Sequence, residues 1–301
     1  MSFVGQSVVY EESSMLMKKT MGIEVSGMQI RRVSKHYGET LNELIDRNCE
    51  SILPAKKTFK DKDISYVMMD GAMVFTVDGE WKEMKLGSVF TESQIIDIHT
   101  NRRQICDAVY VSHLGNVNDF FPKFERHLVH YQGKVIIGDG ARWIWNWAED
   151  NYPGATQILD YYHAKEKLVL FAKEHFTNDK QRKEWLDNQE DKLLHKDNGV
   201  HLVIQTLEQL RNKECSAKSK KKALDYYNEH EDRMDYKRYQ EKGLLIGSGP
   251  IEAAHRSVIQ QRMKLSGQKW SIKGANALAT LRCYNKSNAW NIVTKVIKAA
   301  A

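Results

Sequence analysis

The stretch VIIGDGARWIW, residues 135–145, leads from a buried strand into an acid. Its β-branched residues, Val135, Ile136 and Ile137, predict a strand, and the run ends on Asp139 between two glycines. The stretch YVMMDGAMVF (66–75) carries a second apolar run into Asp-Gly-Ala, at Asp70. A strand-borne carboxylate is costly to bury unless it is paired, protonated or bound to metal. Two such acids indicate a functional site, and the alternative for each is an ordinary turn aspartate.

The segments around these acids predict an α/β fold. Strand patterns at 64–75, 80–90 and 105–112 are followed by a helix at 117–131, a strand at 134–139, a helix that begins with ARWIWNWAED, and a strand at 155–160. Asp78-Gly79 predicts a hairpin between the first two strands. This order favours a mixed five-stranded sheet flanked by helices, with the first and fourth strands parallel and adjacent. Asp70 and Asp139 are then expected to meet.

The remaining segments read as helical. Residues 8–50 predict two helices around a short break, with Ser26 as N-cap, which suits a helix-turn-helix that binds DNA or a pair of helices that simply pack. Arg31 and Arg32 of the second helix are candidate DNA contacts, and a basic linker follows at residues 56–60. Residues 161–243 contain no strand pattern and predict an all-helical insertion before GLLIGSGPIE (243–252).

Composition restricts the class of protein. The chain has 301 residues, 42% of them hydrophobic, which is enough for a large core. No apolar run approaches the roughly 20 residues that span a bilayer, and the first residues lack the order of a secretory signal. The four cysteines form no C-x-x-C pair, which argues against a zinc site and a disulfide framework. We expect a cytoplasmic protein.

The charge distribution indicates a polyanionic partner. Residues 253–301 contain nine Lys and Arg and no Asp or Glu, although the whole chain carries only +6. Such asymmetry favours nucleic acid, and the alternative is a solvated basic helix. The candidate DNA contacts here are His255, Arg256, Arg262, Lys264, Lys269 and Trp270, where Trp270 either stacks on bases or packs in the core.

Acids of this kind suit hard cations. Oxygen ligands favour Mg²⁺ or Mn²⁺, and two ions about 3.5 to 4 Å apart can catalyse phosphodiester transfer when three acids hold them. Asp70 and Asp139 supply two of these acids. Glu252 is the candidate for the third, because GSGP places it in the first turn of a helix whose later turns are basic.

Four motifs in one order carry a resemblance to a known family. The sequences MDGA, IGDGARWIW, ILDYYHAKEKL and GSGPIEAAHRSVIQQRMKLSGQKWS resemble bacterial insertion-sequence transposases of the ISKra and ISLre groups, which are similar to Mutator-like elements. The resemblance covers roughly residues 60–290. It implies a DDE transposase with an RNase H-like catalytic domain, a triad of Asp70, Asp139 and Glu252, and two Mg²⁺ or Mn²⁺ ions.

The same resemblance gives roles to further residues and segments. The family's C/D-x-x-H element falls on Asp160 and His163. We predict that Asp160 contacts DNA, and that His163 is a base, a phosphate contact or a buried histidine tied to Asp160. The implied division is a helix-turn-helix-like segment with its linker (1–60), the first part of the catalytic domain (61–165), the helical insertion (166–243), and the final catalytic helix with the basic segment (244–301).

The implied partner is double-stranded DNA, at transposon ends and target. Joining two ends favours a homodimer or a higher oligomer, associated with the nucleoid and not with a membrane. Two rival functions remain. One is an RNase H-like nuclease that cuts DNA without strand transfer, and the other is a non-catalytic DNA-binding relic of a transposon.

Overall fold

The computed structural model describes residues 1–54, 63–99 and 102–300, and the linker predicted at residues 56–60 lies outside this range. The described chain divides into two compact units. Unit 1 comprises Met1–Lys134 and Gly249–Ala301, and unit 2 comprises Val135–Ser248. The N-terminal helices and the basic C-terminal segment thus belong to one unit, whereas the sequence analysis assigned them to different segments.

The strands confirm the predicted fold class. A mixed five-stranded sheet has the order β5-β2-β1-β6-β7. Helices flank it, an arrangement consistent with the RNase H-like fold that the resemblance implied. The strands are β1 (Ser65–Phe75), β2 (Trp81–Thr91), β5 (Val109–Leu114), β6 (Lys134–Gly138) and β7 (Thr156–Leu159).

Within unit 1, β1 and β2 form the predicted antiparallel hairpin, and β5 pairs antiparallel with β2. Gly79 in the turn has φ of +84°, a conformation that glycine adopts without strain. The structure adds a hairpin that sequence analysis missed, β3 (Ile95–His99) and β4 (Arg102–Ile105). The strand predicted at 105–112 therefore begins too early, because Ile105 is the last residue of β4 and β5 begins only at Val109.

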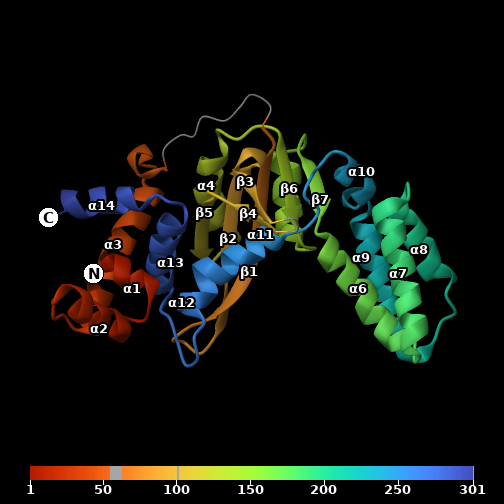
Figure 1. Cartoon of the computed structure of the whole chain (residues 1–301), viewed down its shortest axis with the longest axis horizontal. Coiled ribbons are helices and arrows are strands. Elements are labelled where there is room, and N and C mark those ends of the chain that lie inside the picture. Colours follow the sequence, from red (N-terminus) through yellow and green to blue (C-terminus); the bar gives the residue numbers. More distant parts are fainter. Residues whose placement is uncertain (55–62, 100–101, 301) are drawn as a thin grey trace. The chain divides into compact units, whose positions relative to one another are not determined.

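Three helices of unit 1 pack on strands β1, β2 and β5 (Figure 1). Helix α13 contacts both β5 and α3, α4 covers β5 and β2, and α11 lies on β1 and β2. The elements are α1 (Ser2–Ser7), α2 (Tyr10–Met21), α3 (Gly27–Asp46), α4 (Val117–Leu128), α11 (Gly249–Ala254), the π-helical turn η5 (His255–Gln260), α12 (Gln261–Met263), α13 (Ile272–Lys286) and α14 (Trp290–Ala299).

Helix α3 begins as predicted, because the Ser26 side chain accepts a hydrogen bond from Gln29 N. Its buried face packs closely on α13, since a Cβ built on Gly38 would lie 2.3 Å from Ala277 O. This contact supports the packing role of the N-terminal helices. Arg31 and Arg32 lie on the exposed face of α3.

Unit 2 contains the parallel pair β6 and β7 and the helices that follow them. The predicted all-helical insertion is confirmed for residues 161–243. Helix α6 packs against α7 and α9, and α8 packs against α7 and α9 (Figure 1). The helices are α5 (Arg142–Asn151), α6 (Tyr161–His175), α7 (Asp179–His195), α8 (Gly199–Gln209), α9 (Ala217–Glu229) and α10 (Tyr236–Glu241). Among the described residues, no helix combines the length and apolar character needed to cross a membrane.

Candidate functional site

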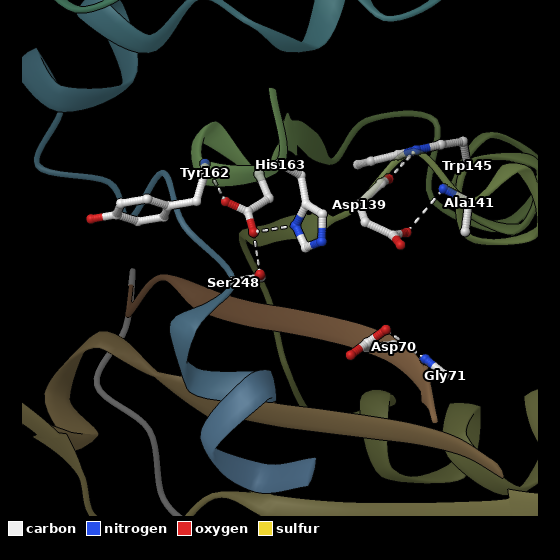
Figure 2. Close-up of polar contacts among 9 residues, drawn as sticks. Asp70, Gly71, Asp139, Ala141, Trp145, Tyr162, His163 and Ser248 are labelled. Carbon is white, nitrogen blue, oxygen red and sulfur yellow. Dashed lines mark hydrogen bonds and ion pairs between the residues drawn. The ribbon is translucent and has the colours of Figure 1, made fainter. Parts of the chain in front are cut away.

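Asp139 follows the last residue of β6 and lies in a hydrogen-bonded turn. Its Oδ1 accepts a hydrogen bond from Ala141 N (2.9 Å), and its backbone oxygen accepts one from Trp145 Nε1 (2.8 Å) (Figure 2). Gly138 lets α5 approach, because a Cβ at this position would be 3.2 Å from Ile144. The turn therefore holds the half-buried carboxylate of Asp139 at the end of the strand.

Asp160 occupies the matching position on the neighbouring strand. Gly138 pairs with Leu159 in the parallel register, and Asp160 N donates to Gly138 O (2.8 Å). Asp139 and Asp160 thus follow paired residues at the carboxyl ends of β6 and β7. The carboxyl edge of parallel strands is where α/β proteins commonly bind ligands.

A hydrogen-bond network surrounds Asp160. Its Oδ1 accepts from Tyr162 N (2.7 Å) and caps α6, while its Oδ2 accepts from His163 Nδ1 (2.8 Å) and from Ser248 Oγ (Figure 2). Burial opposes ionisation of Asp160, but these hydrogen bonds outweigh it and lower the pKa of the carboxyl group. The sequence analysis missed Ser248, although its place directly before the Gly-Pro start of α11 was visible in the motif GSGP.

His163 is the cationic partner in this network. Its hydrogen bond to Asp160 raises the pKa of the imidazole to about 8, against the opposing effect of burial, and the charge of Asp139 contributes in the same direction. The side chain of Asp160 is fully buried, whereas that of His163 is 38% exposed. Asp160 therefore fixes one ring nitrogen of a protonated His163 and leaves an imidazole that reaches solvent.

Asp70 lies within β1 and not at its end, because the strand continues to Phe75. The carboxylate is half-buried, and Oδ1 accepts a hydrogen bond from Gly71 N (2.7 Å). Gly71 makes room for the neighbouring strand, since a Cβ there would be 2.0 Å from Glu83 Oε1. A side chain at position 71 would have to displace the Glu83 carboxylate beside Asp70.

Helix α11 brings Glu252 to the strand of Asp70. The helix packs on β1 and β2, and Glu252 in its first turn is exposed. His255 opens the π-helical turn that follows, is 2% exposed, and places Nε2 3.4 Å from Asp70 Oδ2. Burial lowers the pKa of His255, while the charge of Asp70 opposes this effect. A π-helical turn is rare and frequently marks a functional site.

The candidate site residues, four acids and two histidines, are divided between the two units. Asp70, Glu252 and His255 belong to unit 1, and Asp139, Asp160 and His163 belong to unit 2.

The residues predicted to contact DNA fall into an exposed group and a buried group. Five basic residues are exposed and remain candidates for phosphate contacts: Arg31, Arg32, Arg256, Lys264 and Lys269. Asp160 and His255 are buried at 0% and 2% exposure, which argues against the direct DNA contacts predicted for them. Both contact neighbouring site residues instead.

Two further predictions need correction because the side chains lie in the core. Arg262 is 1% exposed, donates through Nε to Gly5 O, and has its guanidinium over the rings of Tyr10 and Trp270. Trp270 is 9% exposed and donates through Nε1 to Met263 O (3.0 Å). These contacts assign Arg262 and Trp270 to the packing of unit 1 and not to DNA.

Comparison with known proteins gives one family. The sequence model of an uncharacterised protein family, UPF0236, matches residues 6–295. The chain belongs to the UPF0236 family. The matched range extends through both compact units and covers the four acids and two histidines of the candidate site. A search of curated proteins found no match.

Proposed function

We propose that the chain cuts and joins DNA by metal-dependent phosphodiester transfer, as a DDE transposase. Asp70, Asp139 and Glu252 are the proposed metal ligands. The observation that supports this best is the packing of α11 on β1, with His255 against Asp70. This packing places α11, which carries Glu252, against β1, which carries Asp70, although the two elements are far apart in the sequence.

The residues fit hard divalent cations. Carboxylates of the three acids provide oxygen ligands only, and neither Asp70 nor Asp139 is more than partly buried. Backbone amides of Gly71 and Ala141 hold one oxygen of each Asp, which orients the carboxylates before any ligand binds. Bound Mg²⁺ or Mn²⁺, as a pair of ions, would supply Lewis acidity and an activated oxygen nucleophile.

His163 is proposed to handle a proton or a phosphate oxygen near Asp139. Because the pKa of this imidazole is about 8, the ring is mainly protonated at neutral pH. Asp160 accepts from Nδ1, so Nε2 carries the second N–H, which can donate to a phosphate or to a leaving oxygen. Ser248 and Tyr162 N hold Asp160 in place for this purpose.

The exposed basic residues are proposed to bind the DNA backbone. Arg256, Lys264 and Lys269 lie in the segment that has no acids, and Arg31 and Arg32 add a second basic site on α3. Such contacts carry no sequence information but give affinity that falls with salt. Joining two DNA ends also requires two active sites, which is the reason for proposing a homodimer or a higher oligomer.

The proposal is tested with Asp70→Asn, Asp139→Asn and Glu252→Gln. Each change removes a ligand charge at nearly constant volume, so we expect cleavage to be abolished while the melting temperature and DNA binding persist. Cleavage of supercoiled plasmid is measured with Mg²⁺ and with Mn²⁺, and joining is measured with pre-cleaved ends. The control is Asp150→Asn, which alters an exposed acid on α5.

The outcomes separate the functions. Near-normal cleavage by one of the three variants removes that residue from the triad. Cleavage without joining identifies a nuclease. DNA binding by the wild-type protein without cleavage under either metal identifies a binding protein, and the transferase proposal is then wrong.

A further inference from the structure

The turn that carries Asp139 packs against a tyrosine of the helical insertion. Tyr226 lies on α9, and a Cβ built on Gly140 would be 2.5 Å from its Cε2 and 3.2 Å from its hydroxyl oxygen. A side chain at position 140 would therefore displace the ring. Gly140 allows the Tyr226 hydroxyl to lie directly beside the backbone of the Asp139 turn.

The hydroxyl of Tyr226 is buried, and the described part of the chain offers it no hydrogen-bond partner. Leaving a buried donor unsatisfied costs stability, because the group has lost its hydrogen bonds to water. A phenylalanine would fill the same space without that cost. An unsatisfied donor beside a candidate catalytic acid is therefore best explained by an acceptor that arrives with a ligand.

The surroundings of Tyr226 keep its hydroxyl neutral. Burial raises the pKa of the phenol, and the charges of Asp139, Asp160, Glu166 and Glu229 raise it further. The group is therefore a hydrogen-bond donor and not an oxyanion nucleophile.

The ring of Tyr226 is fixed on two sides. Lys167 Nζ lies 5.1 Å from the ring centroid, and the ring of His230 packs edge-on at 4.9 Å. Lys167 also places one positive charge beside this cluster of acids, where it can pair with a phosphate.

We propose that the Tyr226 hydroxyl donates a hydrogen bond to a phosphate oxygen of a nucleic-acid strand bound at Asp139, which makes the helical insertion part of the substrate site. This inference rests on the proposed function, since that function brings a phosphodiester to Asp139. It assigns Tyr226 a substrate contact that the sequence motifs do not mark.

The test compares two adjacent tyrosines. Tyr226→Phe removes only the unsatisfied hydroxyl. Tyr227→Phe is the matched control, because the fully buried Tyr227 donates to Ala164 O (2.9 Å) and holds α9 to α6. Affinity for a fluorescent mixed-sequence DNA duplex is measured by anisotropy with Ca²⁺, at raised salt so that peripheral lysine contacts weaken. Melting temperatures are measured on the same samples.

We expect the two variants to give opposite patterns. Tyr226→Phe should weaken DNA binding about tenfold, as for loss of a hydrogen bond to a charged group, and should not lower the melting temperature. Tyr227→Phe should lower the melting temperature and leave the affinity unchanged. Wild-type affinity in Tyr226→Phe, or a loss of thermal stability like that of Tyr227→Phe, overturns the inference.

The result is distinguishable from failure of the proposed function. If the wild-type protein binds DNA but does not cut it, the transferase proposal is wrong, and the affinity comparison still decides the role of Tyr226. If the wild-type protein cuts DNA and Tyr226→Phe binds and cuts equally well, only the role of Tyr226 is wrong. A wild-type protein that binds no DNA overturns both.

Discussion

Replacing Asp160 by Asn should lower the pKa of His163. The Asn side chain keeps the shape of Asp160, and its oxygen can still accept from Tyr162 N and cap α6. Its amide nitrogen then faces His163 Nδ1 and Ser248 Oγ in place of the carboxylate oxygen. Because an amide N–H donates a hydrogen bond, it favours a neutral His163 ring whose Nδ1 accepts that bond. The protonated ring, which must donate through Nδ1, loses its acceptor.

The size of the effect follows from the structure. The pKa of His163 is about 8 instead of 6.5, a difference that corresponds to about 2 kcal/mol. Since the His163 side chain is 38% exposed, solvent screening reduces the interaction free energy between Asp160 and His163 to roughly 1 kcal/mol. We therefore expect the pKa of His163 to fall by about one unit in Asp160→Asn.

The assay is a pH titration of the histidine ring signals by NMR, with His163→Gln used to assign the resonance. Ser248→Ala serves as the control, because it removes a neutral donor and keeps the charge of Asp160. In this control the pKa of His163 should stay near that of the wild-type protein. Cleavage by Asp160→Asn should then peak at lower pH than cleavage by the wild-type protein.

An unchanged pKa in Asp160→Asn would refute the reasoning, because the hydrogen bond to Asp160 is the largest cause assigned to the raised value. An equal decrease in Ser248→Ala would also contradict it. That result would mean that the position of the Asp160 side chain, and not its charge, determines the state of His163.

The remaining predictions concern stability and DNA affinity. Because the folded-state pKa of His163 is raised, the Asp160–His163 pair should make the wild-type protein more stable than Asp160→Asn. This difference in the free energy of unfolding, measured by urea titration at several pH values, should be complete below about pH 6.5 and lost as the pH rises through about 8. Gly38→Ala should destabilise the protein by about 1 to 3 kcal/mol in urea unfolding, since its Cβ would meet Ala277 O at 2.3 Å; no change would mean that α3 and α13 separate freely. Arg262→Gln should lower the melting temperature without changing the salt dependence of DNA binding. The double change Lys264→Gln and Lys269→Gln should reduce the slope of log K against log[salt] by about 0.9 per lost phosphate contact. Equal slopes for all variants would exclude these lysines from the DNA interface.

Much of the fold follows from local sequence patterns. The strand at 134–138, the hairpin at Gly79 and the N-cap at Ser26 depend on residues that are neighbours in the chain, so their patterns were sufficient. The hairpin of β3 and β4 was missed because Ile95–Ile105 mixes apolar and charged residues without a strict alternation. Its strands are also short, which weakens any periodic signal.

The sequence by itself determined which acids to consider and that the end of the chain is basic, because both are properties of residue type and order. Only the tertiary structure decided which side chains remain available. Arg262 and Trp270 read as DNA contacts, but packing of unit 1 places both in its core. Tyr226 carried no signal, yet α9 brings its hydroxyl against Gly140. Burial and an unsatisfied donor result from contacts between distant segments, and the local pattern of a sequence does not record such contacts.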